Sequence, residues 1–166
     1  MSAVVSEPDT SGWLRTLLSG RPHQVVRNAD GAYLHRWYLL PHNRFHNLYL
    51  HRFVQSDDDR ALHDHPWAFV TVVLVGRYRE VTECGVLERR PGAIARRRAD
   101  HRHRVALLRD REGRERRCWT VVLTGPNVRT WGFWCPRSEE QDRFVPWRDF
   151  GAGGCGEAHA VRGTAS

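Results

Sequence analysis

The chain has 166 residues and a formal net charge of +7, from 26 basic and 19 acidic residues. This length fits one domain, and a hydrophobic fraction of 40% with seven tryptophans can supply a packed core. All the basic residues are arginine, which permits anionic partners, but acidic residues stand between the arginines. No stretch reaches the roughly 18 apolar residues of a membrane helix, and no basic segment followed by an apolar run marks a signal peptide. We therefore expect a soluble cytoplasmic protein without membrane or nucleic-acid partners.

Short strands dominate the pattern after a brief N-terminal helix. Ser11 is the expected cap of a helix over residues 12–18, which Gly20 would end. Strand-like runs then follow, separated by turns rich in glycine, proline and asparagine. The expected strands span residues 33–40, 46–55, 67–75, 77–83, 93–98, 101–108, 118–124, 131–135 and 144–147. Such a series indicates an all-β sandwich or barrel. We expect an N-terminal arm over residues 1–20, a barrel over 21–150 and a flexible tail over 151–166.

The cysteines and two polar segments complete the survey of the chain. Cysteines at positions 84, 118, 135 and 155 form no CxxC pair, so we expect four free thiols in a reducing compartment. Cys118 and Cys135 lie in apolar runs, where a buried and inert side chain is expected. Residues 56–59 are expected to form a solvated loop, and residues 109–117 a charged hairpin tip around Gly113.

A pair of histidines gives the strongest chemical signal. His63 and His65 stand two residues apart, directly before an apolar run. Residues two apart in a strand point to the same face, so both imidazoles would enter the barrel together. Neutral imidazoles are good ligands for Fe, Zn, Ni or Cu, and a third ligand must come from another segment.

The segment around this pair resembles the first motif of the cupin superfamily. In that motif His-x-His is followed after three or four residues by Glu, and after six more by Gly. Gly76 stands at the matching position, and Phe69 takes the place of the Glu. The resemblance therefore implies a metal centre without the usual carboxylate ligand.

The second cupin motif is matched by Gly92 and, at the motif's spacing, by His103, although Arg98 and Asp100 replace its Pro and second Gly. The resemblance covers about residues 33–135. It implies a single cupin-type double-stranded β-helix, or jelly-roll barrel, with one divalent metal ion held by the pair of histidines and His103. Cupins commonly pair through barrel faces, so it also implies a homodimer.

His101 lies two residues before His103 and shares its face of the strand. It is a candidate fourth ligand, proton-transfer group or substrate contact. Asp64 and Asp100 are expected to point away from the site, or to orient ligand imidazoles from outside.

The three-histidine set is similar to that of the thiol-oxidising cupin dioxygenases, in which an Arg on the first strand pairs with the substrate carboxylate. Arg36 falls near that place, and a guanidinium suits bidentate carboxylate binding. Strand parity and proximity to the histidines add further pocket candidates. The candidate substrate-binding residues are Arg36, Tyr49, His51, Trp67, Phe69 and Trp119.

We expect a mononuclear Fe(II) dioxygenase or related oxygenase that acts on a small organic molecule with O2. Two alternatives remain open. One is a non-redox metallo-cupin, an isomerase, lyase or hydrolase that uses Zn, Ni or Mn as a Lewis acid. The other is a cupin that binds a ligand without catalysis.

Overall fold

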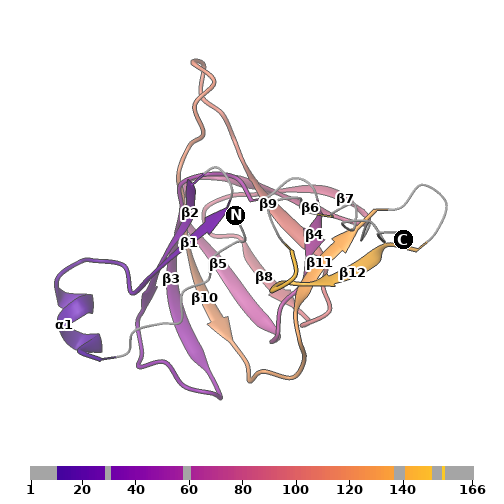
Figure 1. Cartoon of the computed structure of the whole chain (residues 1–166). Helices are drawn as coiled ribbons and strands as arrows, with labels where there is room; N and C mark the ends of the chain where they lie inside the picture. Colours follow the sequence, from indigo (N-terminus) through magenta and orange to yellow (C-terminus); the bar gives the residue numbers. More distant parts are fainter. Residues whose placement is uncertain (1–10, 29–30, 58–60, 137–140, 151–154, 156–166) are drawn as a thin grey trace, which may run out of the picture.

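The computed structural model describes residues 11–28, 31–57, 61–136, 141–150 and 155. Within these residues one short helix precedes a series of strands that form two facing sheets (Figure 1). The elements are α1 (Trp13–Leu18), β1 (Gln24–Asn28), β2 (Gly31–Tyr38), β3 (Asn47–Phe53), β4 (Leu62–His63), β5 (Phe69–Val75), β6 (Tyr78–Thr82), β7 (Gly85–Arg89), β8 (Ile94–Arg97), β9 (His103–Leu107), β10 (Cys118–Thr124), β11 (Gly132–Cys135) and β12 (Arg143–Pro146). Sheet A has the strand order β1-β2-β3-β10-β5-β8, and sheet B has the order β12-β11-β4-β9-β6-β7.

The pairing of eight strands defines the fold. β3 pairs with β10, β4 with β9, β5 with β8 and β6 with β7, always antiparallel. The first strand of the eight therefore pairs with the last, the second with the next to last, and so on inwards. Two antiparallel chain halves that wind together in this way form a double-stranded β-helix. The all-β, cupin-type jelly roll expected from the sequence is confirmed.

Three short strands and one helix cap differ from the expectation. Two of the strands, β1 at the edge of sheet A and β4 with His63, have no counterpart among the expected strands. The third, β7, begins at Gly85, where only a turn was expected. A strand of two residues such as β4 is too short to show a side-chain period. Ser11 does not cap α1, because the N-cap is Gly12, with a φ of 67° and no side-chain cap hydrogen bond.

The expectation of four free thiols is wrong for two of the cysteines. Cys135 of β11 and Cys155 form a disulfide, with Cα atoms 5.2 Å apart. The chain beyond β12 returns to β11, where Phe150 stacks on Phe133 at a centroid distance of 3.6 Å. This return, which cysteine spacing does not reveal, brings the two thiols together. Cys118 is buried and free as expected, and burial raises the pKa of its thiol to about 11.

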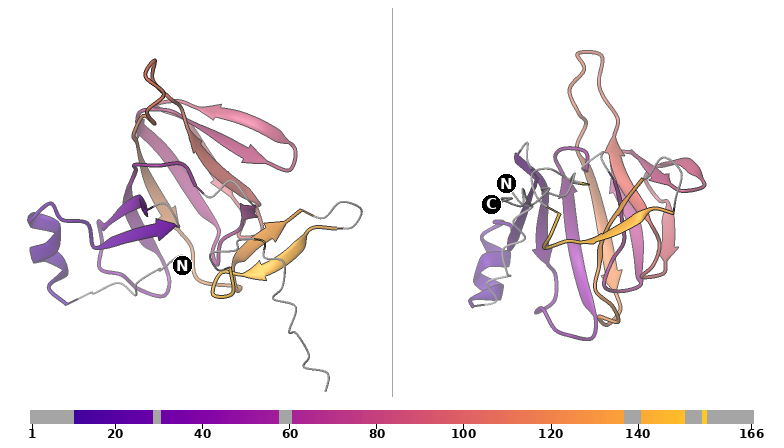
Figure 2. Two further views of the ribbon diagram at one scale, coloured as in Figure 1. Left: turned by 45° about the horizontal axis from the view of Figure 1, so that its top comes forward. Right: turned by 45° about the vertical axis from the view of Figure 1, so that its right-hand side comes forward.

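The charged connection between β9 and β10 projects from the barrel as a hairpin (Figures 1 and 2), as the sequence predicts. Its ion pairs are internal, with Arg114 Nε 3.1 Å from Asp110 Oδ2. The expected flexible tail lies outside the described residues except for Cys155, as do residues 1–10 of the expected arm. Within the described ranges no helix has the length and apolar character needed to span a membrane.

Candidate metal centre

A cavity of about 190 Å³ lies between the two sheets. Its lining includes His63, His65 and His103, which are the three ligands predicted from the sequence. Phe133 of β11 and His103 of β9 pair with His63 from its two sides, so the register of sheet B sets the position of these rings. The cavity is otherwise lined mainly by aliphatic and aromatic side chains.

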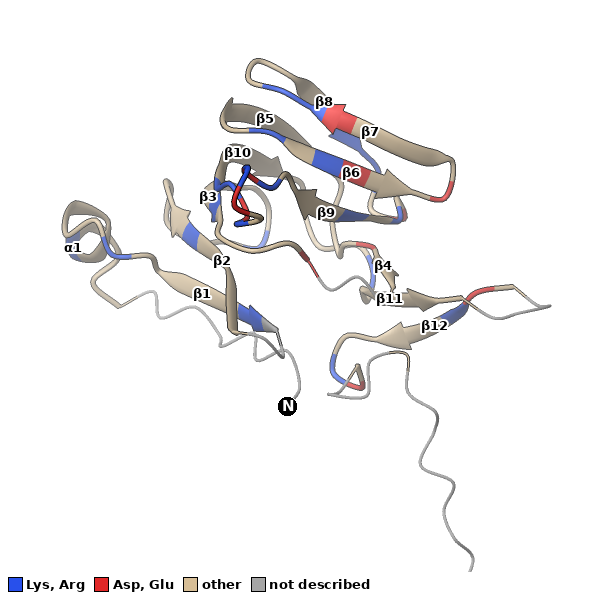
Figure 3. Ribbon diagram, turned by 90° about the horizontal axis from the view of Figure 1, so that it is seen from above, with Lys and Arg blue, Asp and Glu red and all other residues tan. Residues whose placement is uncertain are grey.

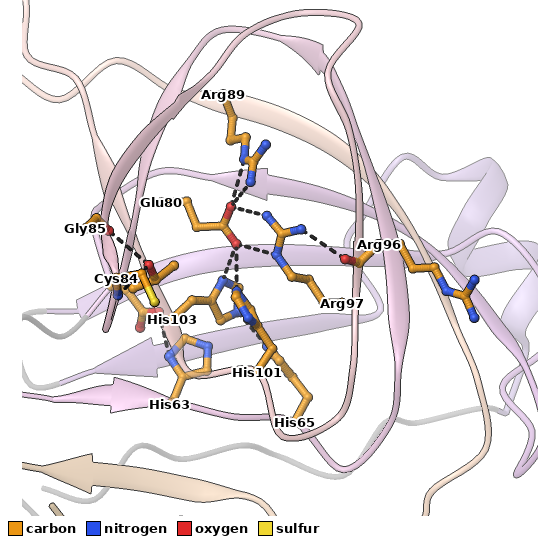
Figure 4. Close-up of polar contacts among 12 residues, drawn as sticks. His63, His65, Glu80, Cys84, Gly85, Arg89, Arg96, Arg97, His101 and His103 are labelled. Carbon is orange, nitrogen blue, oxygen red and sulfur yellow. Dashed lines mark hydrogen bonds and ion pairs between the residues drawn. The ribbon is translucent and has the colours of Figure 1, made fainter.

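The three predicted imidazoles converge at one point of the cavity wall (Figure 4). One ring nitrogen from each of His63, His65 and His103 lies within 4.8 Å of the other two. The closest pair, His65 Nε2 and His103 Nε2, is separated by 2.9 Å. The pairing of β4 with β9 sets His63 beside His103, and His65 follows β4 with its backbone N–H bonded to the carbonyl of Ala99 at 3.1 Å.

Two carboxylates stand behind two of these rings. Asp57 Oδ2 lies 3.1 Å from His63 Nδ1, and Glu80 Oε1 lies 3.2 Å from His103 Nδ1. Each negative charge favours the tautomer with its proton on Nδ1, which leaves the Nε2 lone pair for a ligand. Carboxylates hold metal-binding histidines in this way in many proteins.

Asp57 corrects the expectation that residues 56–59 form a solvated loop. Its side chain is 8% exposed, and its backbone N–H donates to the carbonyl of Val105 at 2.8 Å. This bond ties the start of the loop to β9, beside the histidine cluster. Residues 58–60 lie outside the described part of the chain.

Glu80 is the site residue that the sequence analysis missed. It lies on β6 two residues after the buried Tyr78, points inward and is 2% exposed. Arg89 Nε donates to its Oε2 at 2.7 Å, and Arg97 Nε donates to its Oε1 at 2.8 Å. Burial alone would raise the pKa of Glu80, but His103 and the arginines hold it well below its usual range. Side chains two residues apart in a strand face the same side, so the apolar Tyr78 could have indicated from the sequence that Glu80 also faces inward.

The arginines that neutralise Glu80 come from two neighbouring strands. Arg89 ends β7 and Arg97 ends β8, and the charged segments of β6, β7 and β8 lie close together when the barrel is seen from above (Figure 3). The carboxylate is thus held at the back of His103, between the strands, and not in the cavity (Figure 4).

The structure places His101 behind His103 and not among the cavity-lining residues. Its Nε2 lies 3.3 Å from Glu80 Oε1, and its side chain is 29% exposed. Glu80, His101 and His103 do form a second group with metal-ligand spacing. Two guanidinium groups already neutralise that carboxylate, and their charge opposes a cation at the same place. The cavity-facing histidine set is therefore the better metal site.

Burial keeps two of the three imidazoles neutral. Burial and the two neighbouring rings hold the pKa of His65 well below its usual range. Burial lowers the pKa of His103 to about 4, although Glu80 opposes the shift. Burial also opposes protonation of His63, but the Asp57 carboxylate outweighs it and raises the pKa of that ring. Protons therefore compete with a metal ion mainly at His63.

Phe69 and Trp67 form an apolar wall beside the imidazoles, as expected. The ring of Phe69 lies edge-on to His65 at a centroid distance of 4.7 Å, and 5.8 Å from His103. Trp67 stacks on His65 at 4.7 Å. Because Phe69 offers no ligand atom, the donor set at this point consists of three nitrogens.

Arg36 and His51 lie on the opposite wall, which belongs to sheet A. Arg36 Nε donates to His51 Nε2 at 2.8 Å, and Arg36 Nη1 donates to Gln24 Oε1 at 2.9 Å. Burial and the charge of Arg36 hold the pKa of His51 well below its usual range, so this imidazole is a neutral acceptor. Among the described residues no carboxylate lies within 4.0 Å of the Arg36 guanidinium.

The two remaining pocket candidates do not line the cavity. Tyr49 is buried, stacks on His51 at 5.6 Å and lies under Arg36, whose Cζ is 4.8 Å from the ring centroid. Trp119 alternates to the outer face of sheet A, where it stacks on Trp37 at 5.4 Å. The expectation that Trp119 contacts a ligand in the cavity is therefore not met.

Asp64 stands between two ligands in the sequence but faces away from them. It is fully buried, and its Oδ1 accepts a hydrogen bond from the backbone N–H of Gly132 at 2.9 Å. Its Oδ2 accepts one from Trp134 Nε1 at 2.8 Å and forms an ion pair with Arg129. This buried network anchors the His-x-His segment to β11.

The residues present fit a divalent ion. The centre offers three nitrogen donors, two of them in rings oriented by carboxylates, and an apolar wall adjoins it. Such a set suits Zn, Fe, Ni or Cu more than the oxygen-seeking Mg or Ca.

No protein-family model and no curated protein matches this chain. Its structure is similar to several solved structures. The DMSP lyase DddQ from Ruegeria pomeroyi DSS-3 is 16% identical, with a TM-score of 0.49 over 62% of this chain and 52% of the lyase. The polyketide cyclase RemF from Streptomyces resistomycificus is 17% identical, with a TM-score of 0.46 over 68% of this chain and 72% of the cyclase. A double-stranded β-helix protein from Klebsiella pneumoniae is 16% identical, with a TM-score of 0.48 over 66% of this chain and 84% of that protein. The chain spans about half the length of the lyase, and these likenesses assign no activity to it.

Proposed function

We propose that this chain is a mononuclear metal-dependent enzyme, an Fe(II) dioxygenase or related oxygenase, that acts on a small organic acid. The convergence of three imidazole nitrogens within 4.8 Å of one another, at the wall of a cavity, carries the proposal. His63, His65 and His103 would hold the ion. When bound, Fe(II) supplies the one-electron chemistry that reactions of O2 require.

The chain's own residues orient the site and limit access of water. Asp57 and Glu80 stand beside the Nδ1 atoms of two of these rings, and their charges favour a proton there, which would leave the Nε2 atoms for the ion. Trp67 and Phe69 cover His65 with apolar surface, which lowers the local dielectric.

The free N–H donors of Arg36 favour a substrate that carries a carboxylate. A guanidinium has five N–H donors, and His51 and Gln24 use two of them. The remaining donors, on Nη1 and Nη2, can bind a carboxylate end-on. A carboxylate there would supply the negative charge that Arg36 lacks among the described residues.

A non-redox lyase, isomerase or hydrolase is the second candidate. The observation that favours it is the same donor set, because three histidines also suit a zinc ion that acts as a Lewis acid. The two candidates differ in whether turnover needs O2.

Anaerobic reconstitution with Fe(II), followed by O2-uptake measurements across small carboxylic acids, tests the proposal. We expect one metal ion per chain and acid-dependent O2 consumption, both lost in His63→Ala and kept in His35→Ala, whose ring lies near Trp37 on the outer face. Zinc binding with acid conversion in the absence of O2 would select the second candidate. Failure of the wild-type chain to retain any divalent ion would refute both.

A further inference from the structure

One buried polar atom in the cavity wall has no partner within the described chain. The side chain of Thr120, on β10, is 0% exposed and lines the cavity. Its Oγ1 makes no hydrogen bond with any described residue. Buried hydroxyl groups are almost always hydrogen-bonded, so a partner that is not part of the chain is expected here.

Thr120 belongs to a polar row across the inner face of sheet A. It pairs in register with His51 of β3, and His51 pairs with Arg36 of β2. All three side chains line the cavity. Neighbouring inward positions on the same wall include the apolar Leu34 and Val122 and the polar Thr71 of β5.

Arg36 reaches the strand that lies next to the strand of Thr120. Its Nε bonds to His51 of β3 and its Cζ lies over the ring of Tyr49 of β3, while its Nη1 is held by Gln24 of β1. The strand that carries Thr120 is one strand spacing away, about 4.8 Å. A ligand bound to Arg36 therefore needs to extend only a few bonds to reach the Thr120 hydroxyl.

We propose that this row is a substrate subsite for a small carboxylate that bears a second oxygen, a hydroxyl or a carbonyl, a few bonds from the carboxylate. The free N–H groups of Arg36 bind the carboxylate, and Thr120 Oγ1 hydrogen-bonds to the second oxygen. His51 holds the guanidinium in place. The inference rests on the proposed function, because it names the substrate class of the same cavity.

The size of the cavity agrees with a ligand of this kind. A volume of about 190 Å³ corresponds to roughly six water molecules at about 30 Å³ each. An acid of four or five carbons fits this space, whereas a nucleotide does not. The competing partner for Thr120 is a bound water molecule.

Binding of butanoate, 3-hydroxybutanoate and 4-hydroxybutanoate, measured by calorimetry on the wild-type chain with and without Zn(II), tests the inference. We expect at least one hydroxy acid to bind about 3- to 10-fold more tightly than butanoate. Thr120→Val, which keeps the shape but lacks the hydroxyl, should remove this preference, and Thr120→Ser should keep it. Val122→Ala, on the same strand and wall, should change the three affinities alike.

Equal binding of the three acids by the wild-type chain, or an unchanged preference in Thr120→Val, overturns the inference and assigns the hydroxyl to a water molecule. Thr120→Ala gives the same comparison if Thr120→Val does not fold. The assay needs no turnover. An absence of enzymatic activity together with a hydroxyl preference would therefore reject the proposed function alone, whereas activity without the preference would reject only the subsite.

Discussion

The two walls of the cavity carry opposite chemistry. The wall of sheet B presents the candidate ligand imidazoles, with the carboxylate of Asp57 beside His63 in the cavity lining and that of Glu80 behind His103. The wall of sheet A presents the guanidinium of Arg36 and the hydroxyl of Thr120. A cation at the imidazoles and an anion at Arg36 would thus meet across the cavity. On the proposed function, metal binding and acid binding would depend on different strands, so mutations should be able to remove one without the other.

Removal of a ligand from the sheet B wall should have the largest effect. His103→Ala deletes one of three candidate donor nitrogens and one of the two imidazoles that contact Glu80. We expect metal affinity to fall at least about 100-fold, beyond the range seen when only an outer partner is removed. Metal content by elemental analysis and competition with a zinc chelator measure the change. Wild-type affinity in this variant would show that the triad is not the metal site.

Glu80→Gln should come next. The neutral amide cannot neutralise Arg89 and Arg97, which leaves two partly buried positive charges without their shared carboxylate. We expect a loss of about 3–5 kcal/mol in the free energy of unfolding and about 10- to 100-fold in metal affinity. Urea unfolding and chelator competition report the two quantities. The control is Glu88→Gln, whose exposed ion pairs with Arg77 and Arg90 should contribute less than about 1 kcal/mol.

A lower pH should reduce the free energy of unfolding of the metal-free protein, because of the buried histidines on the sheet B wall. His65 and His103 have pKa values below the usual 6.5, and that of His103 is about 4, so the unfolded chain binds more protons below pH 6.5. Because stability rises with pH wherever the unfolded state binds more protons, it falls as the pH is lowered, and unfolding should become easier from about pH 6.5 down to about pH 4. The raised pKa of His63 acts in the opposite sense and offsets part of the loss. Urea unfolding against pH measures this, and a flat profile would contradict the buried neutral state of these rings.

The local parts of this site could be predicted from the sequence, and the parts set by pairing between strands could not. The His-x-His spacing predicted that His63 and His65 act together, and both line the cavity although the strand ends at His63; motif spacing located His103. Strand parity could have indicated that Glu80 faces inward, but its place beside His103 depends on the pairing of β6 with β9, which no local pattern states. Trp119 was assigned to the wrong face because parity gives alternation along a strand but not which face is inside.

On the sheet A wall, Arg36→Leu should weaken the binding of acids without changing the metal content. This change removes the guanidinium that faces the cavity, together with its hydrogen bonds to His51 and Gln24. We expect acid binding to weaken about 10- to 100-fold, as loss of a charged hydrogen bond does, and metal content to stay at one ion per chain. Calorimetry with butanoate measures it. Arg52→Leu is the control, since Arg52 lies over Trp119 on the outer face of the same sheet. Loss of metal in Arg36→Leu would show that the two walls are not independent.

The smallest effect should come from His101→Ala. The imidazole is 29% exposed and contacts Glu80 from behind, while Arg89 and Arg97 still hold that carboxylate after its removal. An exposed contact of this kind contributes little, so we expect metal affinity to change by no more than about 3-fold. Chelator competition distinguishes this result from a fourth-ligand role. A loss as large as that of His103→Ala would place His101 on the ion and move the metal site toward Glu80. The carboxylate would then face the cation directly, and the separation of charge between the two walls would no longer hold.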